Sequence, residues 1–164
     1  MAGNIKIVVC KSADEVAKKT AGIFVQQVRN KPDSVLGFAT GSTPMKSYEE
    51  IAKLAKAERV SFSKVVSFNL DEYWGLDGDH DQSYRYFMNT ELFQKIDLRP
   101  WNAHVLNGKA KLPAVECAAF EQQIVAVGGI DLWVLGIGNN GHVAFNEPGS
   151  PVDSRTRLVS LTQS

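Results

Sequence analysis

Short apolar runs alternate with amphipathic stretches along the whole chain. Continuous apolar runs of a few residues are typical of strands that are covered on both faces of a sheet. Six segments fit this pattern, and we expect each to form a strand. They are residues 5–10, 35–39, 65–70, 104–106, 130–136 and 157–161.

The segments between these runs carry helix signals. Ser12 and Glu15 have the spacing of a capping box, which predicts the start of a helix. A second helix is predicted over 44–56, with its proline in the first turn, and a third, rich in aromatic residues, over 82–93. A fourth ends at the Gly128-Gly129 pair. Apolar residues recur at helical intervals in the first and fourth helices: Val16, Ala17, Thr20, Ala21, Phe24 and Val28, and then Cys117, Phe120, Ile124 and Val127.

The regular alternation of strands and helices predicts an α/β fold. Right-handed crossovers between parallel strands place helices on both faces of the sheet. We therefore expect a doubly wound, Rossmann-like and mostly parallel sheet, formed by one domain over residues 1–164.

Composition and charge exclude several classes of function. The chain has 18 basic and 18 acidic residues, whereas proteins that bind nucleic acid usually carry a basic excess. The apolar runs are far shorter than the roughly 20 residues that cross a bilayer, and the first residues lack the pattern of a secretory signal. These observations argue against a nucleic-acid or a membrane partner. Cys10 and Cys117 are unclustered, which favours two reduced, buried thiols in a cytoplasmic protein.

Three polar clusters follow three of the predicted strands. They are residues 40–44, residues 69–73, and residues 138–142 with 146–149. Ligands of open α/β sheets bind at the carboxyl ends of the strands. We therefore expect these clusters to converge on one edge of the sheet and to form a single site.

The first cluster has the composition of an anion site. Thr40, Gly41, Ser42 and Thr43 precede a helix, and backbone N–H groups at a helix N-terminus suit a phosphate. An equally good alternative is a capped turn in which Ser42 or Thr43 is the N-cap. In the third cluster, residues 136–141 match G-x-G-x-x-G, but no helix or acidic residue follows at the required spacing, so we reject a dinucleotide site.

The other two clusters carry groups that can move protons. His142 can exchange a proton near neutral pH, and Glu147 can orient it. Asp71 can act as a general base, although capping of the next turn is the default role for such a residue. Glu72 is expected to point elsewhere because neighbouring side chains of an extended chain diverge.

Further residues have simpler interpretations. Tyr73 and Trp74 either line a pocket or cover the core. The remaining aromatic residues of this region are expected in the core: Tyr84, Tyr86, Phe87 and Phe93. His80 and His104 are read as surface or structural residues, and no ligand spacing indicates a metal site.

Three motifs together resemble the glucosamine-6-phosphate deaminase family. They are residues 39–44 (ATGSTP), 68–73 (FNLDEY) and 141–148 (GHVAFNEP). Residues 82–84, 106–108 and 154–157 add further matches, so the resemblance covers nearly the whole chain. The related 6-phosphogluconolactonases share the fold and a Gly-His loop but lack the Phe-Asn-Glu-Pro continuation.

The resemblance implies conversion of glucosamine 6-phosphate and water to fructose 6-phosphate and ammonium, without metal or organic cofactor. Asp71 would move a proton between C2 and C1, and His142 would assist ring opening with Glu147 holding it in orientation. Thr40–Thr43 would bind the 6-phosphate. Asn140 stands where many members have aspartate, which implies a changed pH dependence.

The resemblance also bears on regulation and assembly. Residues matching Ser150 and Arg157 bind an effector in allosteric members, but the lysine two positions beyond the arginine is Val159 here. The family contains monomers and hexamers, so a homo-oligomer is possible. Because Ser164 comes well before the family's usual end, we expect weak substrate binding and slow turnover by these 164 residues. Two alternatives stay open: a sugar-phosphate-binding module without catalysis, and a lactone hydrolase.

Overall fold

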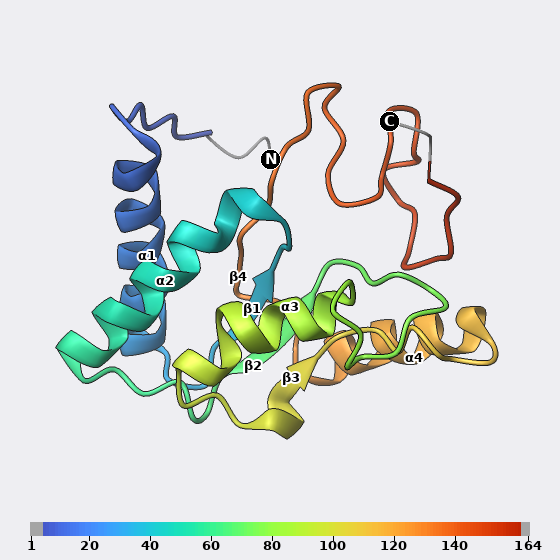
Figure 1. The fold of residues 1–164 in the computed structure, drawn as a ribbon, viewed down its shortest axis with the longest axis horizontal. Helices are drawn as coiled ribbons and strands as arrows, with labels where there is room; N and C mark the ends of the chain where they lie inside the picture. The colour runs from blue at the N-terminus through green and yellow to red at the C-terminus, as the bar shows by residue number, and fades with distance from the viewer. Residues whose placement is uncertain (1–4, 162–164) are drawn as a thin grey trace.

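The computed structural model describes residues 5–161, which form an α/β fold around a four-stranded sheet (Figure 1). The strands are β1 (Val35–Phe38), β2 (Val66–Asn69), β3 (Ala103–His104) and β4 (Leu132–Trp133). They are all parallel and have the spatial order β3-β2-β1-β4. Because β1 lies inside the sheet, the chain first winds outward to β3 and then returns to the other side of β1, as in a doubly wound fold.

Helices cover both faces of this sheet. On one face, α1 (Ala13–Asn30), α2 (Ser42–Glu58) and α3 (Tyr84–Glu91) share a core with the β1 side chains of Leu36 and Phe38. On the other face, α4 (Pro113–Ala126) places Phe120 against Val35 and Phe68. Two short 3₁₀ helices, Phe93–Lys95 and Pro100–Asn102, lie between α3 and β3. The predicted fold class is confirmed.

The ends of the helices follow the sequence signals. The Ser12 hydroxyl accepts a hydrogen bond from the Glu15 N–H (3.2 Å), and the Glu15 carboxylate accepts one from the Lys11 N–H (2.9 Å). α4 ends at Ala126, and Gly128 and Gly129 follow it with positive φ angles of 87° and 90°. Glycine adopts this left-handed backbone without steric cost, which explains the stop.

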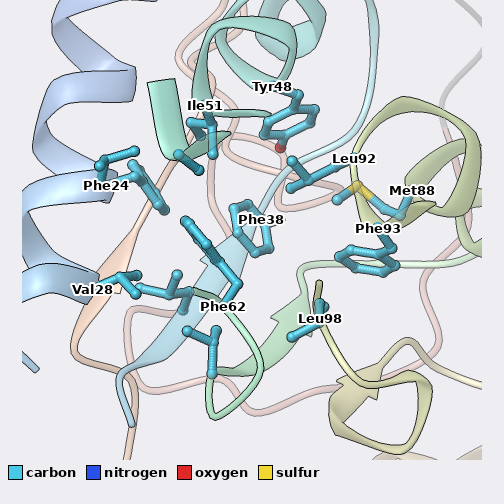
Figure 2. Packing of buried hydrophobic residues seen from close by; sticks show 14 of the residues in the cluster. Phe24, Val28, Phe38, Tyr48, Ile51, Phe62, Met88, Leu92, Phe93 and Leu98 are labelled. Atoms are coloured by element: carbon cyan, nitrogen blue, oxygen red, sulfur yellow. The ribbon is translucent and has the colours of Figure 1, made fainter. Parts of the chain in front are cut away.

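The core is centred on Phe38, the last residue of β1 (Figure 2). Its ring lies 5.5 Å from that of Phe24, 5.6 Å from that of Tyr48 and 6.3 Å from that of Phe93. The buried Tyr48 hydroxyl donates a hydrogen bond to the Ala39 carbonyl, and burial raises the pKa of this hydroxyl. The core therefore fixes the backbone directly before Thr40.

Two of the strand predictions are wrong, because the segments form no strand. Residues 5–10 form no strand, and Ile5, Ile7 and Val9 are 91%, 82% and 89% exposed. Residues 157–161 also have no regular structure. An apolar run becomes a strand only when a neighbouring strand takes its backbone hydrogen bonds. Within the described part of the chain, no strand is paired with either segment.

Other predicted elements are present but shorter. Of residues 130–136, only Leu132–Trp133 pair with β1. They form β4, a strand of two residues at the edge of the sheet. The aromatic helix ends at Glu91 and continues as a 3₁₀ turn. Helix α2 starts at Ser42, so its proline lies in the first turn as predicted.

Two further expectations can be compared with residues 5–161. None of the helices described there is long and apolar enough to cross a bilayer. Cys10 and Cys117 are free thiols, as predicted, but only Cys117 is buried. Burial raises the pKa of the Cys117 thiol.

Candidate active site

The polar clusters all follow neighbouring parallel strands, so they leave the sheet at the same edge. β1 leads into Thr40, β2 into Asp71, and β4 into the loop of residues 134–149. Figure 1 shows the segment after β4, coloured orange to red, as a series of loops beyond the sheet.

A cavity of about 400 Å³ lies where the segments after β2, β3 and β4 meet α4. Its walls combine one acidic group at a strand end with aromatic, amide and basic side chains. They include Asp71, Tyr73, Trp74, Leu106, Glu121, Trp133, Phe145, Asn146, Arg155 and Arg157. Tyr73 and Trp74 therefore line a pocket rather than cover the core.

Asp71 is a half-buried carboxyl group in the wall of this cavity. Burial raises the pKa of Asp71 from its ordinary 3.8 to about 7, and the charge of Glu72 adds to the rise. A general base works best when its pKa lies close to the working pH. The cavity therefore contains a carboxyl group that can take and return a proton at neutral pH.

Glu72 is engaged by the start of α3 rather than free in the cavity. One of its oxygens accepts hydrogen bonds from the Tyr73 N–H (2.8 Å) and the Tyr84 N–H (2.9 Å). The other accepts from the Ser83 hydroxyl (2.8 Å) and the Arg85 N–H (3.0 Å). The oxygens of Glu72 are thus bound to the start of α3, although the residue also lines the cavity next to Asp71.

The rings of Tyr73, Tyr84 and Phe145 join the segment after β2 to the loop after β4. Tyr73 lies 4.8 Å from Tyr84 and 5.5 Å from Phe145 between ring centroids, and Tyr84 lies 6.0 Å from Phe145. The Tyr84 hydroxyl donates a hydrogen bond to that of Tyr73 (3.2 Å). Residues that are far apart in sequence therefore meet at one site.

Tyr84 is the functional-site residue that the sequence reasoning assigned wrongly. Burial raises its pKa, as do Tyr73 and the charge of Asp71, whereas a hydrogen bond with Thr40 lowers it. Tyr84 thus contacts or faces residues of the first two polar clusters, and its ring contacts Phe145 in the loop after β4, instead of lying in the core. Tyr86 is also outside the core, at 43% exposure, whereas Phe93 is buried as predicted and Phe87 packs against the core.

A tight turn presents Phe145 to the two tyrosines. Val143 and Asn146 pair through two backbone hydrogen bonds of 3.4 and 3.0 Å. Ala144, between them, has a left-handed φ of 53°, which costs a residue with a side chain about 1–2 kcal/mol. Such strain is maintained where the surroundings hold the turn, and here the aromatic contacts of Phe145 do so.

His142, Asn140 and Glu147 form one hydrogen-bonded chain in this loop. Asn140 donates through Nδ2 to Glu147 (2.7 Å), and its oxygen lies 2.8 Å from His142 Nδ1. A carboxylate only accepts, so it fixes the orientation of the amide. Because the amide oxygen also only accepts, Nδ1 of neutral His142 carries the proton and Nε2 offers a lone pair. Glu147 acts mainly through Asn140, because its Oε1 lies 3.8 Å from Nδ1 of His142, which is too far for a hydrogen bond.

His142 packs over Gly138, where a side chain has no room. A Cβ at this position would lie 2.2 Å from the imidazole Cε1. The Gly138 N–H also donates to the His142 carbonyl (2.8 Å). The absence of a side chain at Gly138 therefore makes room for the histidine ring.

We expect Gly138→Ala to push the imidazole off Asn140 while the fold stays intact, because the clashing atoms end a side chain that can rotate. Proton transfer by His142 should slow about tenfold or more. The free energy of unfolding should change by no more than about 0.5 kcal/mol. Gly136→Ala is the matched control, since among the described residues no atom lies within 4 Å of a Cβ there. Steady-state kinetics and thermal unfolding of both variants check this. Equal activities in the two variants would contradict it.

Thr40–Thr43 lead from β1 into α2. Gly41 is the N-cap, with φ of 105°, and no side chain of the described residues caps the helix. Ser42 and Thr43 are exposed in the first turn, so neither is the N-cap that the alternative interpretation required. The first N–H groups of α2 therefore keep their capacity to bind an anion.

Arg157 and Ser150 contact the loop that carries His142. The Arg157 guanidinium donates to the Asn146 side-chain oxygen (3.0 Å) and the Ser150 hydroxyl (3.4 Å). The segment before Arg157 is held by Glu121 of α4, which accepts from the Thr156 N–H (2.9 Å) and hydroxyl (2.8 Å). Arg157 thus lines the same cavity as Asp71.

The remaining candidate groups lie apart from this cavity. His104 stacks on Phe68 at 4.7 Å, and burial lowers its pKa. His80 is exposed at the surface. Over residues 5–161, no three His, Cys, Asp or Glu side chains are placed to hold a metal ion together. His142 is not part of the cavity wall, although the loop residues after it are.

Comparison with known proteins shows the family of this chain. Residues 10–164 match the family model described as glucosamine-6-phosphate isomerases/6-phosphogluconolactonase. The chain belongs to this family. It is 55% identical over 156 residues to glucosamine-6-phosphate deaminase 1 of Giardia intestinalis, covering 95% of this chain and 58% of the relative. It is 53% identical over 159 residues to the deaminase of Shewanella loihica, covering 97% and 59%.

Solved structures of family members have the same fold. A monomeric glucosamine-6-phosphate deaminase matches with a TM-score of 0.95 and 40% identity, over 97% of this chain and 66% of that one. A 6-phosphogluconolactonase of Thermotoga maritima matches with a TM-score of 0.69 and 26% identity, over 86% and 63%. The chain thus spans slightly less than three fifths of the length of the curated relatives named above.

Proposed function

We propose that this family member takes part in the conversion of glucosamine 6-phosphate and water to fructose 6-phosphate and ammonium. The observation that carries the proposal is the half-buried Asp71, with a pKa of about 7, in a cavity joined to the His142 loop through Phe145. Relatives more than 50% identical that are named glucosamine-6-phosphate deaminases support the choice of substrate.

The first step is opening of the sugar ring. Neutral His142 has its proton on Nδ1, facing Asn140, so Nε2 can accept the proton of the anomeric hydroxyl. The same nitrogen then returns the proton to the ring oxygen as the ring bond breaks. Asn140 and Glu147 keep the imidazole in this tautomer. A neutral amide stabilises the transient imidazolium less than a carboxylate does, which shifts the pH dependence.

The second step moves a proton between carbon atoms. Asp71, as carboxylate, takes the proton from C2 of the open aldehyde while the substrate's ammonium group gives a proton to the aldehyde oxygen O1, which leaves an enolamine. Asp71 then returns its proton to C1, so that C2 becomes a protonated imine. The C2 imine that results adds water and releases ammonium. Proton transfer at carbon and proton transfer at oxygen are different tasks. The proposal therefore assigns the Asp71 carboxyl group to the carbon atoms and the His142 imidazole to the sugar oxygens.

Thr40, Gly41, Ser42 and Thr43 bind the 6-phosphate in this proposal. The uncapped first turn of α2 offers backbone N–H groups and two exposed hydroxyls. An anchored phosphate orients the distant reacting carbons, which is a large part of the catalytic advantage of such a site. A phosphorylated sugar is charged and does not cross membranes, which is consistent with a cytoplasmic protein.

Two roles stay predictions within this proposal. Ser150 and Arg157 bind an effector only if the cavity that Arg157 shares with Asp71 leaves room for it. Assembly into a homo-oligomer also stays a prediction; one structural neighbour is described as monomeric.

The test is a coupled assay of ammonium and fructose 6-phosphate from glucosamine 6-phosphate, at high protein concentration because slow turnover is expected. We expect equimolar products, and a loss of about 10²-fold in His142→Ala. The loss is limited because hexose phosphates also open without a catalyst. His80→Ala is the matched control, since this exposed imidazole lies outside the site.

Other outcomes favour the alternatives. Hydrolysis of 6-phosphogluconolactone without ammonium from the amino sugar would make the protein a lactone hydrolase. Binding of glucosamine 6-phosphate without turnover would make it a binding module. Either result would contradict the deaminase proposal.

A further inference from the structure

Glu72 lies beside the general-base candidate but has no assigned role in the proposed reaction. Its carboxylate accepts four hydrogen bonds, three from backbone N–H groups and one from a hydroxyl. Three of these donors belong to the start of α3, which is eleven or more residues further along the chain. One carboxylate therefore joins the segment after β2 to α3.

The bonds of Glu72 determine where two tyrosine rings lie. The same oxygen, Oε1, accepts from the backbone N–H of Tyr73 and from that of Tyr84. Those two rings contact each other, and both contact Phe145. Because Phe145 follows His142 by three residues, a shift of the tyrosines is transmitted to the loop that holds the imidazole.

We propose that Glu72 is a positioning residue, which fixes Asp71 relative to the His142 loop through Tyr73, Tyr84 and Phe145. Glu72 needs no contact with the substrate for this task. The inference rests on the proposed function for its kinetic consequences, but the positions of the rings and of the Asp71 carboxyl group can be measured without turnover.

The charge of Glu72 adds a second effect that separates this role from simple helix capping. It helps to keep the pKa of Asp71 near 7, after the larger effect of burial. Other titratable or charged groups face the same cavity as Asp71, from the adjoining segment, α3, α4 and the segment after residue 150. These are Tyr73, Tyr84, Glu121, Arg155 and Arg157.

Two substitutions divide position from charge. Glu72→Gln removes the charge and, in either orientation of the amide, sets a donor N–H against a backbone N–H that the carboxylate accepts from. Glu72→Asp keeps the charge but is one methylene shorter, so it no longer reaches α3. Glu91→Gln, at the other end of the same helix, is the matched control because it removes an equal charge far from the site.

The first measurement is carbon-13 NMR of the Asp71 carboxyl group over pH, with aromatic contacts between Phe145 and Tyr73. In Glu72→Gln we expect the Asp71 titration to move to lower pH and the ring contact to weaken. In Glu72→Asp we expect the ring contact to weaken with the titration nearly unmoved. Glu91→Gln should match the wild type in both. An unchanged ring contact in both Glu72 variants would overturn the proposal.

The second measurement is the pH profile of kcat. Activity needs Asp71 as carboxylate, so kcat rises with pH through its titration. We expect this limb at lower pH in Glu72→Gln, with kcat on the plateau reduced about tenfold or more in both Glu72 variants. A plateau equal to the wild type in both would contradict the positioning role. If the wild type releases no ammonium, the proposed function fails, whereas the NMR result still decides this inference.

Discussion

Asp71→Asn should abolish deamination while leaving sugar-phosphate binding in place. Asparagine has nearly the same shape as aspartate but cannot take a proton from carbon. General-base catalysis by a positioned group contributes about 10²–10⁴-fold, so we expect a loss of about 10³-fold in kcat. The coupled ammonium assay measures turnover, and calorimetry with glucosamine 6-phosphate measures binding. Turnover within tenfold of the wild type would contradict the role of Asp71.

The same substitution should make the protein more stable above neutral pH. The pKa of Asp71 is raised in the folded state to about 7, from 3.8, because burial disfavours the charged form. The folded chain therefore keeps a proton that the unfolded chain releases, and stability falls as pH rises from about 4 to 7. One pKa unit corresponds to about 1.4 kcal/mol of unfolding free energy. Because part of the Asp71 side chain is exposed, we expect the protein to lose only about 2 kcal/mol of stability over this pH range, and Asp71→Asn to avoid that loss.

A control of opposite sign is available in Asp131. Hydrogen bonds and charge from Lys31, and a bond from the Val35 N–H, lower the pKa of this carboxyl group. Removing its charge with Asp131→Asn should therefore destabilise the protein at neutral pH and have little effect at low pH. Urea unfolding at pH 5 and pH 8 distinguishes the two carboxylates. A destabilised Asp71→Asn at pH 8 would show that Asp71 has a structural role instead.

The fold and the general place of the site follow from local patterns in the sequence. Buried strands that alternate with capped helices predict a parallel sheet, and parallel strands bring their carboxyl ends to one edge. For this reason the segments after β1, β2 and β4 could be assigned to one edge before the structure was known. The interval between Ser12 and Glu15 also predicts the start of α1, because both partners lie within one helical turn.

What the sequence could not show are contacts between distant segments. Glu72 meets the start of α3 across a separation of 11 to 13 residues, and no local motif marks that pairing. Tyr84 has the pattern of a core aromatic, and only its neighbours Tyr73 and Phe145 reveal its place at the site. Likewise, residues 5–10 have the composition of a strand, but composition does not supply a neighbouring strand.

Phe38→Ala should destabilise the fold more than any substitution in the loops of the site. Phe38 is fully buried and contacts the rings of Phe24, Tyr48 and Phe93 (Figure 2). Truncating a buried phenylalanine to alanine costs about 3–5 kcal/mol, since transfer energy is lost and a cavity remains. Whole domains are stable by only about 5–15 kcal/mol, so a large part of the total would disappear.

The loss should also reach the site, because Phe38 is the last residue of β1. Its carbonyl accepts hydrogen bonds from the Leu70 N–H (3.2 Å) and the Asn69 side chain (3.3 Å), directly before Asp71. We therefore expect a raised KM together with the lower midpoint of urea unfolding. Tyr86→Ala, which truncates a partly exposed ring on α3, should cost less than about 1 kcal/mol. Equal losses in the two variants would show that the aromatic cluster around Phe38 does not dominate the stability of the core.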